Sequence, residues 1–98
     1  MIIVTGSVTA RVDSFDALRE ASLAHVHRSR AEDGCLLHSV QVDCENPLRL
    51  FFYEQWRDMA ALQTHFAQPG SHAFMQAVRE HSASSENIAL FEASAIRA

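Results

Sequence analysis

The chain contains no lysine, because all eight of its basic residues are arginine. Without a lysine amine it cannot form a Schiff base with a carbonyl substrate or hold a pyridoxal cofactor through one. It also lacks an arginine cluster and any run of like charge, and its net charge is -4. Nucleic acid and anionic membrane surfaces select for concentrated positive charge. We therefore expect no nucleic-acid or membrane partner, and look instead to small molecules and proteins.

Long hydrophobic runs and cysteines are scarce as well. No segment approaches the roughly 20 apolar residues that span a bilayer. The stretch Met1-Ile2-Ile3-Val4 has no basic residues before it, unlike an export signal. Cys35 and Cys44 lie in one predicted strand, where a rise of about 3.3 Å per residue separates them by roughly 30 Å. That distance excludes an intrachain disulfide, so we expect a cytoplasmic location and cysteines that serve as small packing residues.

The chain does have enough apolar residues, 48% of 98, for one hydrophobic core. We therefore predict a single domain over residues 1–98. Apolar residues alternate as in strands, or recur at helical spacing, in seven segments. These are a strand at 2–12, a helix at 14–31 capped by Asp13, strands at 35–44 and 48–56, helices at 59–67 (capped by Asp58) and 71–82, and a strand at 87–97. The order β-α-β-β-α-α-β predicts an α+β, ferredoxin-like fold with a four-stranded antiparallel sheet and helices on one face.

The strand at 48–56 carries large side chains on both faces. One set is predicted to face the helices: Leu48, Leu50, Phe52, Glu54 and Trp56. The alternate set, Arg49, Phe51, Tyr53 and Gln55, faces the other way, with Phe91, Ala93 and Ala95 of the last strand expected beside it. An exposed aromatic face of this kind normally marks an interface. We therefore predict a homodimer packed sheet against sheet, with Arg49, Phe51, Tyr53 and Phe91 in the interface.

Trp56 and His65 are the leading candidates for chemistry. An indole facing the helices is a flat apolar wall with one N–H donor, suited to an aromatic ligand that carries an oxygen. It could equally be a core tryptophan bonded to a backbone carbonyl. His65 is expected at the edge of a helical stripe made by Met59, Leu62 and Phe66. Its imidazole could take a proton from a phenol, or it could be a capping or surface histidine.

Three other polar features are weaker. His72 begins the next helix and could assist His65. Glu54 is a carboxylate in a half-buried strand, so we expect it to be paired, for instance with an arginine, or to have a raised pKa. No metal site is expected, because the side chains of His25 and His27 diverge by about 200° on a helix. The break at 69–70 also separates His65 from His72.

Several short motifs carry a resemblance that covers nearly the whole chain. They are SRAEDGC, with Ser29, Arg30, Glu32, Gly34 and Cys35; Asn46-Pro47; YEQWRDMAALQTH, with Glu54, Trp56, Asp58, Ala61, Leu62 and His65; and finally His72 and Phe74. In these motifs and their spacing the chain resembles the antibiotic biosynthesis monooxygenase family, whose members share a ferredoxin-like fold and pair into a dimeric α/β barrel. Asp33 stands where the family usually has proline, and His38 where tyrosine is common. The link at 68–71 is longer than usual.

The resemblance implies a monooxygenase of the quinol-oxidising branch, which uses O2 and no cofactor. His65 and Trp56 would be the catalytic residues. The substrate-binding residues would be Phe52, Glu54, Phe66, His72 and Phe74. Haem is a weaker expectation, because the haem-degrading branch uses an asparagine in the first strand and this chain offers only Thr5, Ser7 and Thr9. Two alternatives remain open: a non-catalytic dimeric module that binds small molecules, and a cofactor-free isomerase of a small carbonyl compound.

Overall fold

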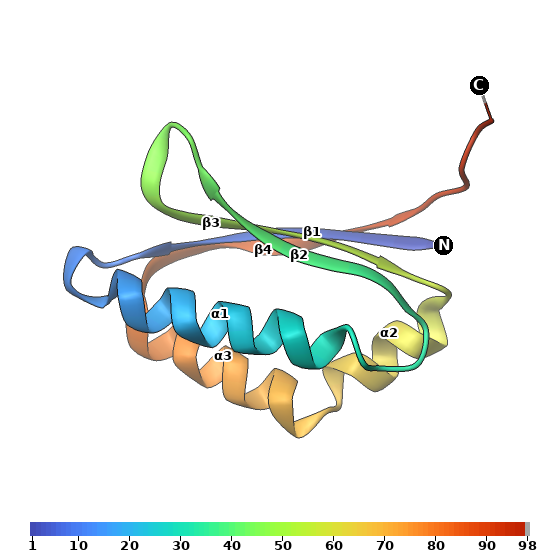
Figure 1. The fold of residues 1–98 in the computed structure, drawn as a ribbon, viewed down its shortest axis with the longest axis horizontal. Helices are drawn as coiled ribbons and strands as arrows, with labels where there is room; N and C mark the ends of the chain where they lie inside the picture. Colours follow the sequence, from blue (N-terminus) through green and yellow to red (C-terminus); the bar gives the residue numbers. More distant parts are fainter. Residues whose placement is uncertain (98) are drawn as a thin grey trace.

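Four antiparallel strands form one sheet in the computed structural model, which describes residues 1–97. The elements follow in the order β1 (Ile2–Ala10), a short 3-10 turn η1 (Val12–Ser14), α1 (Phe15–Ser29), β2 (Cys35–Asp43), β3 (Asn46–Trp56), α2 (Met59–Phe66), α3 (Pro69–His81) and β4 (Ser82–Glu92). The strand order is β2-β3-β1-β4, and all three α-helices lie on one face of the sheet (Figure 1). The predicted α+β, ferredoxin-like fold is confirmed.

The alternation predicted for the strand at 48–56 accounts for the core. In β3 the side chains of Leu50, Phe52, Glu54 and Trp56 point toward the helices, and none is more than 8% exposed. β3 pairs with β1 on one side and β2 on the other, so it lies inside the sheet. Two hydrophobic clusters form against this face, one around Leu50 and Phe52 and one around Trp56. The burial of the strand thus follows from its period-two pattern.

Helix α1 packs through a stripe that is apolar at one end and polar at the other. Leu18, Ser22 and Val26 are at most 1% exposed, and Phe15 packs against the same core. The buried stripe continues with His25 and Ser29 toward the C-terminal end of the helix. Ser29 satisfies its hydroxyl by donating to the carbonyl of His25, over 2.7 Å. The polar end of this stripe is what brings an imidazole into the interior.

Several predicted boundaries were wrong. The last strand is β4 at Ser82–Glu92 and not 87–97, so Ala95 lies outside the sheet. Its serine-rich beginning has no strand pattern of its own, but backbone pairing with β1 extends the strand to Ser82. Asp13 does not cap the first helix, since Ser14 is its N-cap residue and no side chain caps it. α3 begins at Pro69 and not at residue 71, because proline lacks only an N–H that the first helical turn leaves unpaired anyway.

Helix α2 confirms its predicted cap but not its predicted packing face. The Asp58 carboxylate accepts a hydrogen bond from the backbone N–H of Ala61 over 2.8 Å. Met59 and Phe66 were expected on the inner stripe, yet they are 38% and 39% exposed. The inner face consists of Ala61, Leu62 and His65. The helix is therefore rotated so that His65 points inward.

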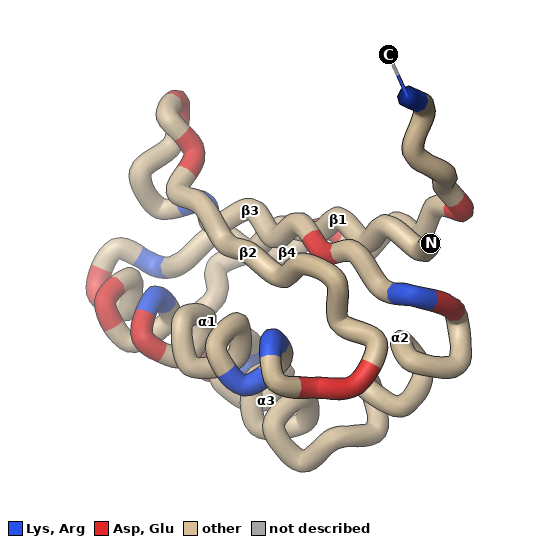
Figure 2. The backbone as a smooth tube through the Cα atoms, turned by 45° about the vertical axis from the view of Figure 1, so that its right-hand side comes forward, with Lys and Arg blue, Asp and Glu red and all other residues tan. Residues whose placement is uncertain are grey.

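The helix-free face of the sheet is rich in apolar side chains. Leu37 and Phe91 are 39% and 52% exposed there, and Phe51 and Tyr53 are partly exposed. Register places Ile3 between Gln55 and Phe91, so the face continues across β2, β3, β1 and β4. Charged residues lie mainly along α1, in the turns and near the chain ends, with few on the sheet (Figure 2). Among residues 1–97, no helix is long and apolar enough to cross a membrane.

Gly34 joins α1 to β2 with a backbone φ of 84°, which side-chain-bearing residues rarely adopt. A Cβ there would meet the Cβ of Ala61 on α2. We expect Gly34→Ala to lower the free energy of unfolding by about 2 kcal/mol or more, since it adds left-handed strain to an overpacked contact. Urea denaturation of both proteins measures this difference.

Gly70→Ala is the matched control. A Cβ at Gly70 would meet the guanidinium end of Arg28, which is a flexible side chain, and Gly70 has no positive φ. The expected change is below about 1 kcal/mol. Equal losses in the two variants would contradict this account of the Gly34 turn.

Candidate functional site

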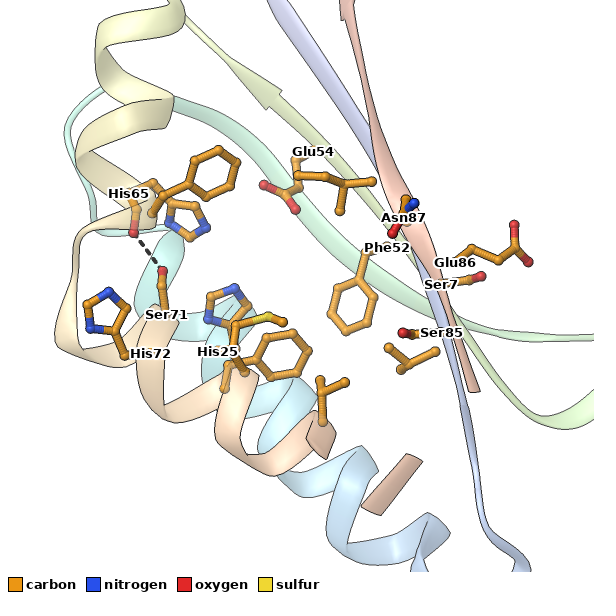
Figure 3. Close-up of a pocket in the computed structure, with 17 residues that line it drawn as sticks. Ser7, His25, Phe52, Glu54, His65, Ser71, His72, Ser85, Glu86 and Asn87 are labelled. Carbon is orange, nitrogen blue, oxygen red and sulfur yellow. Dashed lines mark hydrogen bonds between the residues drawn. The ribbon is translucent and has the colours of Figure 1, made fainter. Parts of the chain in front are cut away.

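A cavity of about 470 Å³ lies between the helices and the β1–β4 side of the sheet. Most of its wall is apolar, with side chains contributed by the sheet, α2 and α3: Val8, Phe52, Phe66, Phe74, Met75, Val78 and Ile88. One end is polar and is formed by His25, Glu54 and His65 (Figure 3). The cavity can therefore enclose a small, mostly apolar molecule and place one end of it against imidazole and carboxylate groups.

An irregularity in strand pairing shapes the wall on the β4 side. The register of β1 against β4 shifts between Thr5 and Ser7, at Gly6. A Cβ on Gly6 would lie 3.0 Å from the side chain of Ile88. Asn87 and Ile88 of β4 both line the cavity at this point. Such a bulge re-aims side chains, and here it turns the edge of the sheet into part of the pocket.

His65 is held at the polar end of the cavity by contacts on two sides. Its side chain is only 3% exposed, and its Nδ1 lies 2.9 Å from Glu32 Oε1. An ionised carboxylate can only accept, so Nδ1 carries the proton and donates to Glu32. Nε2 is then left as the nitrogen with a free lone pair. The ring also packs on Trp56 with 4.5 Å between ring centroids, so its orientation is set on two sides.

Glu54 is held by Trp56 and His38 and not by the arginine expected from the sequence. The indole N–H of Trp56 donates to Glu54 Oε1 over 2.8 Å, and His38 Nε2 lies 3.2 Å from the same oxygen. Burial acts to raise the pKa of Glu54, yet His38 and the Trp56 donor outweigh it and leave the pKa below its usual range. Trp56 is fully buried and does not line the cavity. Trp56 therefore contacts Glu54 from outside the cavity, and its indole N–H is already bonded to that carboxylate.

Two histidines that the sequence analysis did not select join His65. His25 on α1 and His38 on β2 are 6% and 1% exposed, and their ring centroids lie 5.2 Å and 5.5 Å from that of His65. Position 25 falls one heptad after Leu18 on the buried stripe, and His38 alternates with Val40 and Val42 on the inner face of β2. Those periodicities predict that both imidazoles lie in the interior of the protein.

The other predicted site residues occupy distinct places. Phe52 and Phe74 pack together in the cavity wall with 5.3 Å between ring centroids, and Phe74 also stacks on His25. Phe66 and His72 line the cavity as well, but both are exposed residues at its rim. On the opposite face of the sheet, Arg49 forms ion pairs with Asp43 and Glu86. The long link at 68–71 contributes Ser71, whose hydroxyl donates to the carbonyl of His65 over 2.6 Å.

His25 makes stability depend on pH. Burial, followed by the neighbouring His38 and His65, lowers the pKa of His25 to about 3, while Glu54 acts weakly in the other direction and Arg28 adds slightly to the decrease. The unfolded chain binds a proton near its ordinary pKa of 6.5, but the folded chain does not. The contribution of His25 to the free energy of unfolding is therefore fully present above pH 6.5 and is lost as the pH falls toward 3. The slope approaches about 1.4 kcal/mol per pH unit.

Urea denaturation between pH 7 and pH 5 measures this slope. EDTA is present to remove trace metal ions, which would also bind the imidazole. In that range carboxylates stay ionised, so histidines dominate it. His25→Phe keeps a ring against Phe74 and should flatten the curve. His27→Ala, which removes an exposed histidine of the same helix, should leave it unchanged. An unchanged slope in His25→Phe would contradict the assignment.

Comparison with known proteins agrees with this architecture. The family model described as "Antibiotic biosynthesis monooxygenase" matches residues 1–77. A crystal structure of a candidate antibiotic biosynthesis monooxygenase from Deinococcus radiodurans superposes with a TM-score of 0.93 at 28% identity, covering 100% of this chain and 97% of that one. A protein from Pseudomonas aeruginosa gives a TM-score of 0.86 at 28% identity, covering 96% and 94%.

A curated relative, an uncharacterized protein of Synechocystis sp., is 32% identical over 75 residues, which is 76% of this chain. The chain spans about half the length of that relative, 51%. The family model covers more than half of the chain and includes β1 through most of α3. By sequence and by fold, the chain belongs to the antibiotic biosynthesis monooxygenase family.

Proposed function

We propose that the protein is a monooxygenase that oxidises a small electron-rich aromatic compound, a quinol or a phenol, with O2. The observation that carries this proposal is the cavity itself, which is apolar and aromatic along most of its wall and ends in His25, Glu54 and His65. A hydroxylated ring fits this distribution, with its carbon face on Phe52 and Phe74 and its oxygen at the polar end. Membership of the family supports the reaction class.

The chemistry needs little from the protein, because the substrate is itself the reductant. For a hydroquinone, one oxygen atom of O2 forms a new C–O bond and the other leaves as water, so the product is a hydroxylated quinone and all four electrons come from the ring. Removal of the phenolic proton raises the electron density that O2 attacks. A site for this reaction must bind the ring, stabilise its anion and exclude water from the peroxy intermediate.

His65 is the group suited to receive the phenolic proton. Its Nδ1–H is engaged by Glu32, so the lone pair on Nε2 remains for the substrate, and the carboxylate stabilises the imidazolium that forms. This is the usual arrangement of a general base oriented by a third group. Trp56 has a positioning role, because its N–H fixes Glu54 Oε1. Phe52, Phe66, Phe74 and His72 complete the binding surface.

We also propose that two copies pair through the helix-free face of the sheet. Partly exposed Phe51 and Tyr53, with Phe91 at 52% exposure, form an apolar area that a solitary chain would leave in water. The charge of Arg49 is neutralised by Asp43 and Glu86, and its guanidinium lies 5.7 Å from the centre of the Phe51 ring. The area is therefore compatible with a second sheet packed against it.

Of the other candidate functions, the isomerase is less well supported. It would favour a polar pocket with an arginine to hold a carbonyl compound, and no arginine of residues 1–97 lines the cavity. A non-catalytic binding module fits the aromatic wall equally well. Consumption of O2 distinguishes the proposed monooxygenase from a binding module.

An oxygen electrode tests the proposal with a panel of substituted hydroquinones and naphthols, in EDTA and at a pH where autoxidation is slow. We expect O2 uptake in proportion to protein concentration for at least one compound. If the compounds quench Trp56 fluorescence on binding, yet none is oxidised faster than in buffer, the protein is a binding module and the proposed activity is refuted.

A further inference from the structure

Three imidazoles from three separate elements meet at the polar end of the cavity. They belong to His25 on α1, His38 on β2 and His65 on α2, and one ligand atom from each lies within 4.8 Å of the other two. All three residues are at least nine-tenths buried. Imidazole is among the ligands that Zn²⁺ and related transition metals prefer.

The protein leaves a nitrogen atom in this cluster unused. Nδ1 of His38 is buried without a hydrogen-bond partner, whereas Nε2 of the same ring faces Glu54 Oε1 over 3.2 Å. A buried polar group without a partner carries a desolvation cost. A metal ion bound to that nitrogen would remove the cost, because coordination replaces the missing hydrogen bond.

His65 is arranged as metal-binding histidines usually are. Such a histidine donates its second ring N–H to a carboxylate, which fixes the tautomer and the ring orientation. Here Nδ1 is 2.9 Å from Glu32 Oε1, which frees Nε2 for an ion. Glu54 stands next to the cluster as a second carboxylate. Two carboxylates beside three imidazoles favour a divalent cation.

The spacing requires only a modest closure. Zn–N bonds of about 2.0–2.1 Å place the nitrogens of a tetrahedral site about 3.4 Å apart. The present separations, at most 4.8 Å, shrink to that value when the rings rotate inward. The ring pairs are already at 5.2 to 5.5 Å between centroids.

We propose that His25, His38 and His65 bind one divalent transition-metal ion of the Zn²⁺ class. Three protein ligands leave one coordination position open, and His25 and His65 both line the cavity, so that position faces the site of the aromatic molecule. This goes beyond the proposed oxidation, which draws its electrons from the substrate. In the loaded protein the ion, in place of His65, presents itself to the substrate oxygen.

Tag-free protein stripped with EDTA and desalted is titrated with Co²⁺ as a spectroscopic probe for Zn²⁺, without any aromatic compound. We expect one Co²⁺ per chain, the intense visible absorption of four-coordinate cobalt, and its loss when Zn²⁺ is added. Zn²⁺ should also raise the thermal unfolding midpoint, because it binds the folded chain preferentially.

His25→Phe and His38→Gln each remove one ligand and should weaken Co²⁺ binding by more than about 100-fold, whereas Glu32→Gln removes only the outer partner of His65 and should weaken it by about 10- to 100-fold. His27→Ala, on the same helix as His25 but exposed, should bind as the wild type does. If either ligand variant fails to fold, the Glu32→Gln titration and the effect of Zn²⁺ on the unfolding midpoint of the wild type still test the proposed metal site.

Six-coordinate Co²⁺ spectra, more than one ion per chain, or equal affinity in His25→Phe, Glu32→Gln and wild type would overturn the site. Oxygen uptake is measured separately in EDTA. Absence of oxidation therefore refutes the proposed function while leaving the titration valid, and absence of Co²⁺ binding refutes the metal site while leaving oxidation untouched.

Discussion

His65→Ala should lower kcat/KM for aromatic oxidation by about 100-fold or more in the presence of EDTA, the loss expected when a general base is removed. His65 is the one imidazole of the cavity whose Nδ1 is held by a carboxylate, Glu32, and whose Nε2 is left for a substrate. Without that ring the phenol keeps its proton, and O2 meets a much less reactive ring. Oxygen-electrode rates over a range of substrate concentrations give the ratio.

Two further measurements separate chemistry from folding. Added imidazole should restore part of the activity of His65→Ala, because the deleted ring leaves a space of its own shape, and a purely structural role would give no such rescue. His27→Ala should retain wild-type rates. Trp56→Phe removes the donor that fixes Glu54 and should cost less, about tenfold. Full activity in both His65→Ala and Trp56→Phe would refute the assigned site.

Phe91→Asp should convert the proposed dimer to monomers. Phe91 is 52% exposed on the helix-free face, so the fold of one chain does not depend on it, but a second sheet packed there would bury the new charge unpaired. The loss of an aromatic anchor alone costs 2 kcal/mol or more at an interface hot spot. We therefore expect the dimer dissociation constant to rise by at least about 100-fold, measured by sedimentation equilibrium.

Val12→Asp places the same charge on an exposed apolar residue, 84% exposed, that lies outside this face. Its dissociation constant should equal that of the wild type. Phe51→Asp tests the centre of the face in the same way. A wild-type chain that sediments as a monomer at all concentrations would rule out the proposed interface, and so would Phe91→Asp and Phe51→Asp variants that both remain dimeric.

How far the sequence predicts this molecule depends on the range of the interactions involved. The inward row of β3 and the Asp58 cap follow from spacing within a few residues, so both were predicted and are confirmed. The start of β4 depends on pairing with β1, and the inward turn of His65 on the contact of α2 with Trp56. Neither is encoded locally, and both predictions needed correction.

The imidazole cluster shows the same limit more sharply. His25, His38 and His65 come from three elements separated by up to 40 positions, and each is unremarkable within its own segment. Weighing only histidines that are neighbours in sequence, His25 with His27 and His65 with His72, led to the expectation of no metal site. The sequence does predict that two of these imidazoles are buried. His25 follows Leu18 at helical spacing, and His38 alternates with Val40 in its strand, so each ring lies on an inner face.

The direct junction of α3 and β4 fixes one end of a helix that walls the cavity. β4 begins at Ser82, the residue immediately after α3. Arg11 fastens this junction twice, through its backbone N–H to the carbonyl of His81 and its guanidinium to the carbonyl of Glu80. The opposite end of α3 is held as well, because the Ser71 hydroxyl donates to the carbonyl of His65 and the Arg28 guanidinium donates to the carbonyl of Gly70. The helix that walls the cavity is therefore anchored at both of its ends, which favours a preformed cavity over one that must be assembled around its occupant.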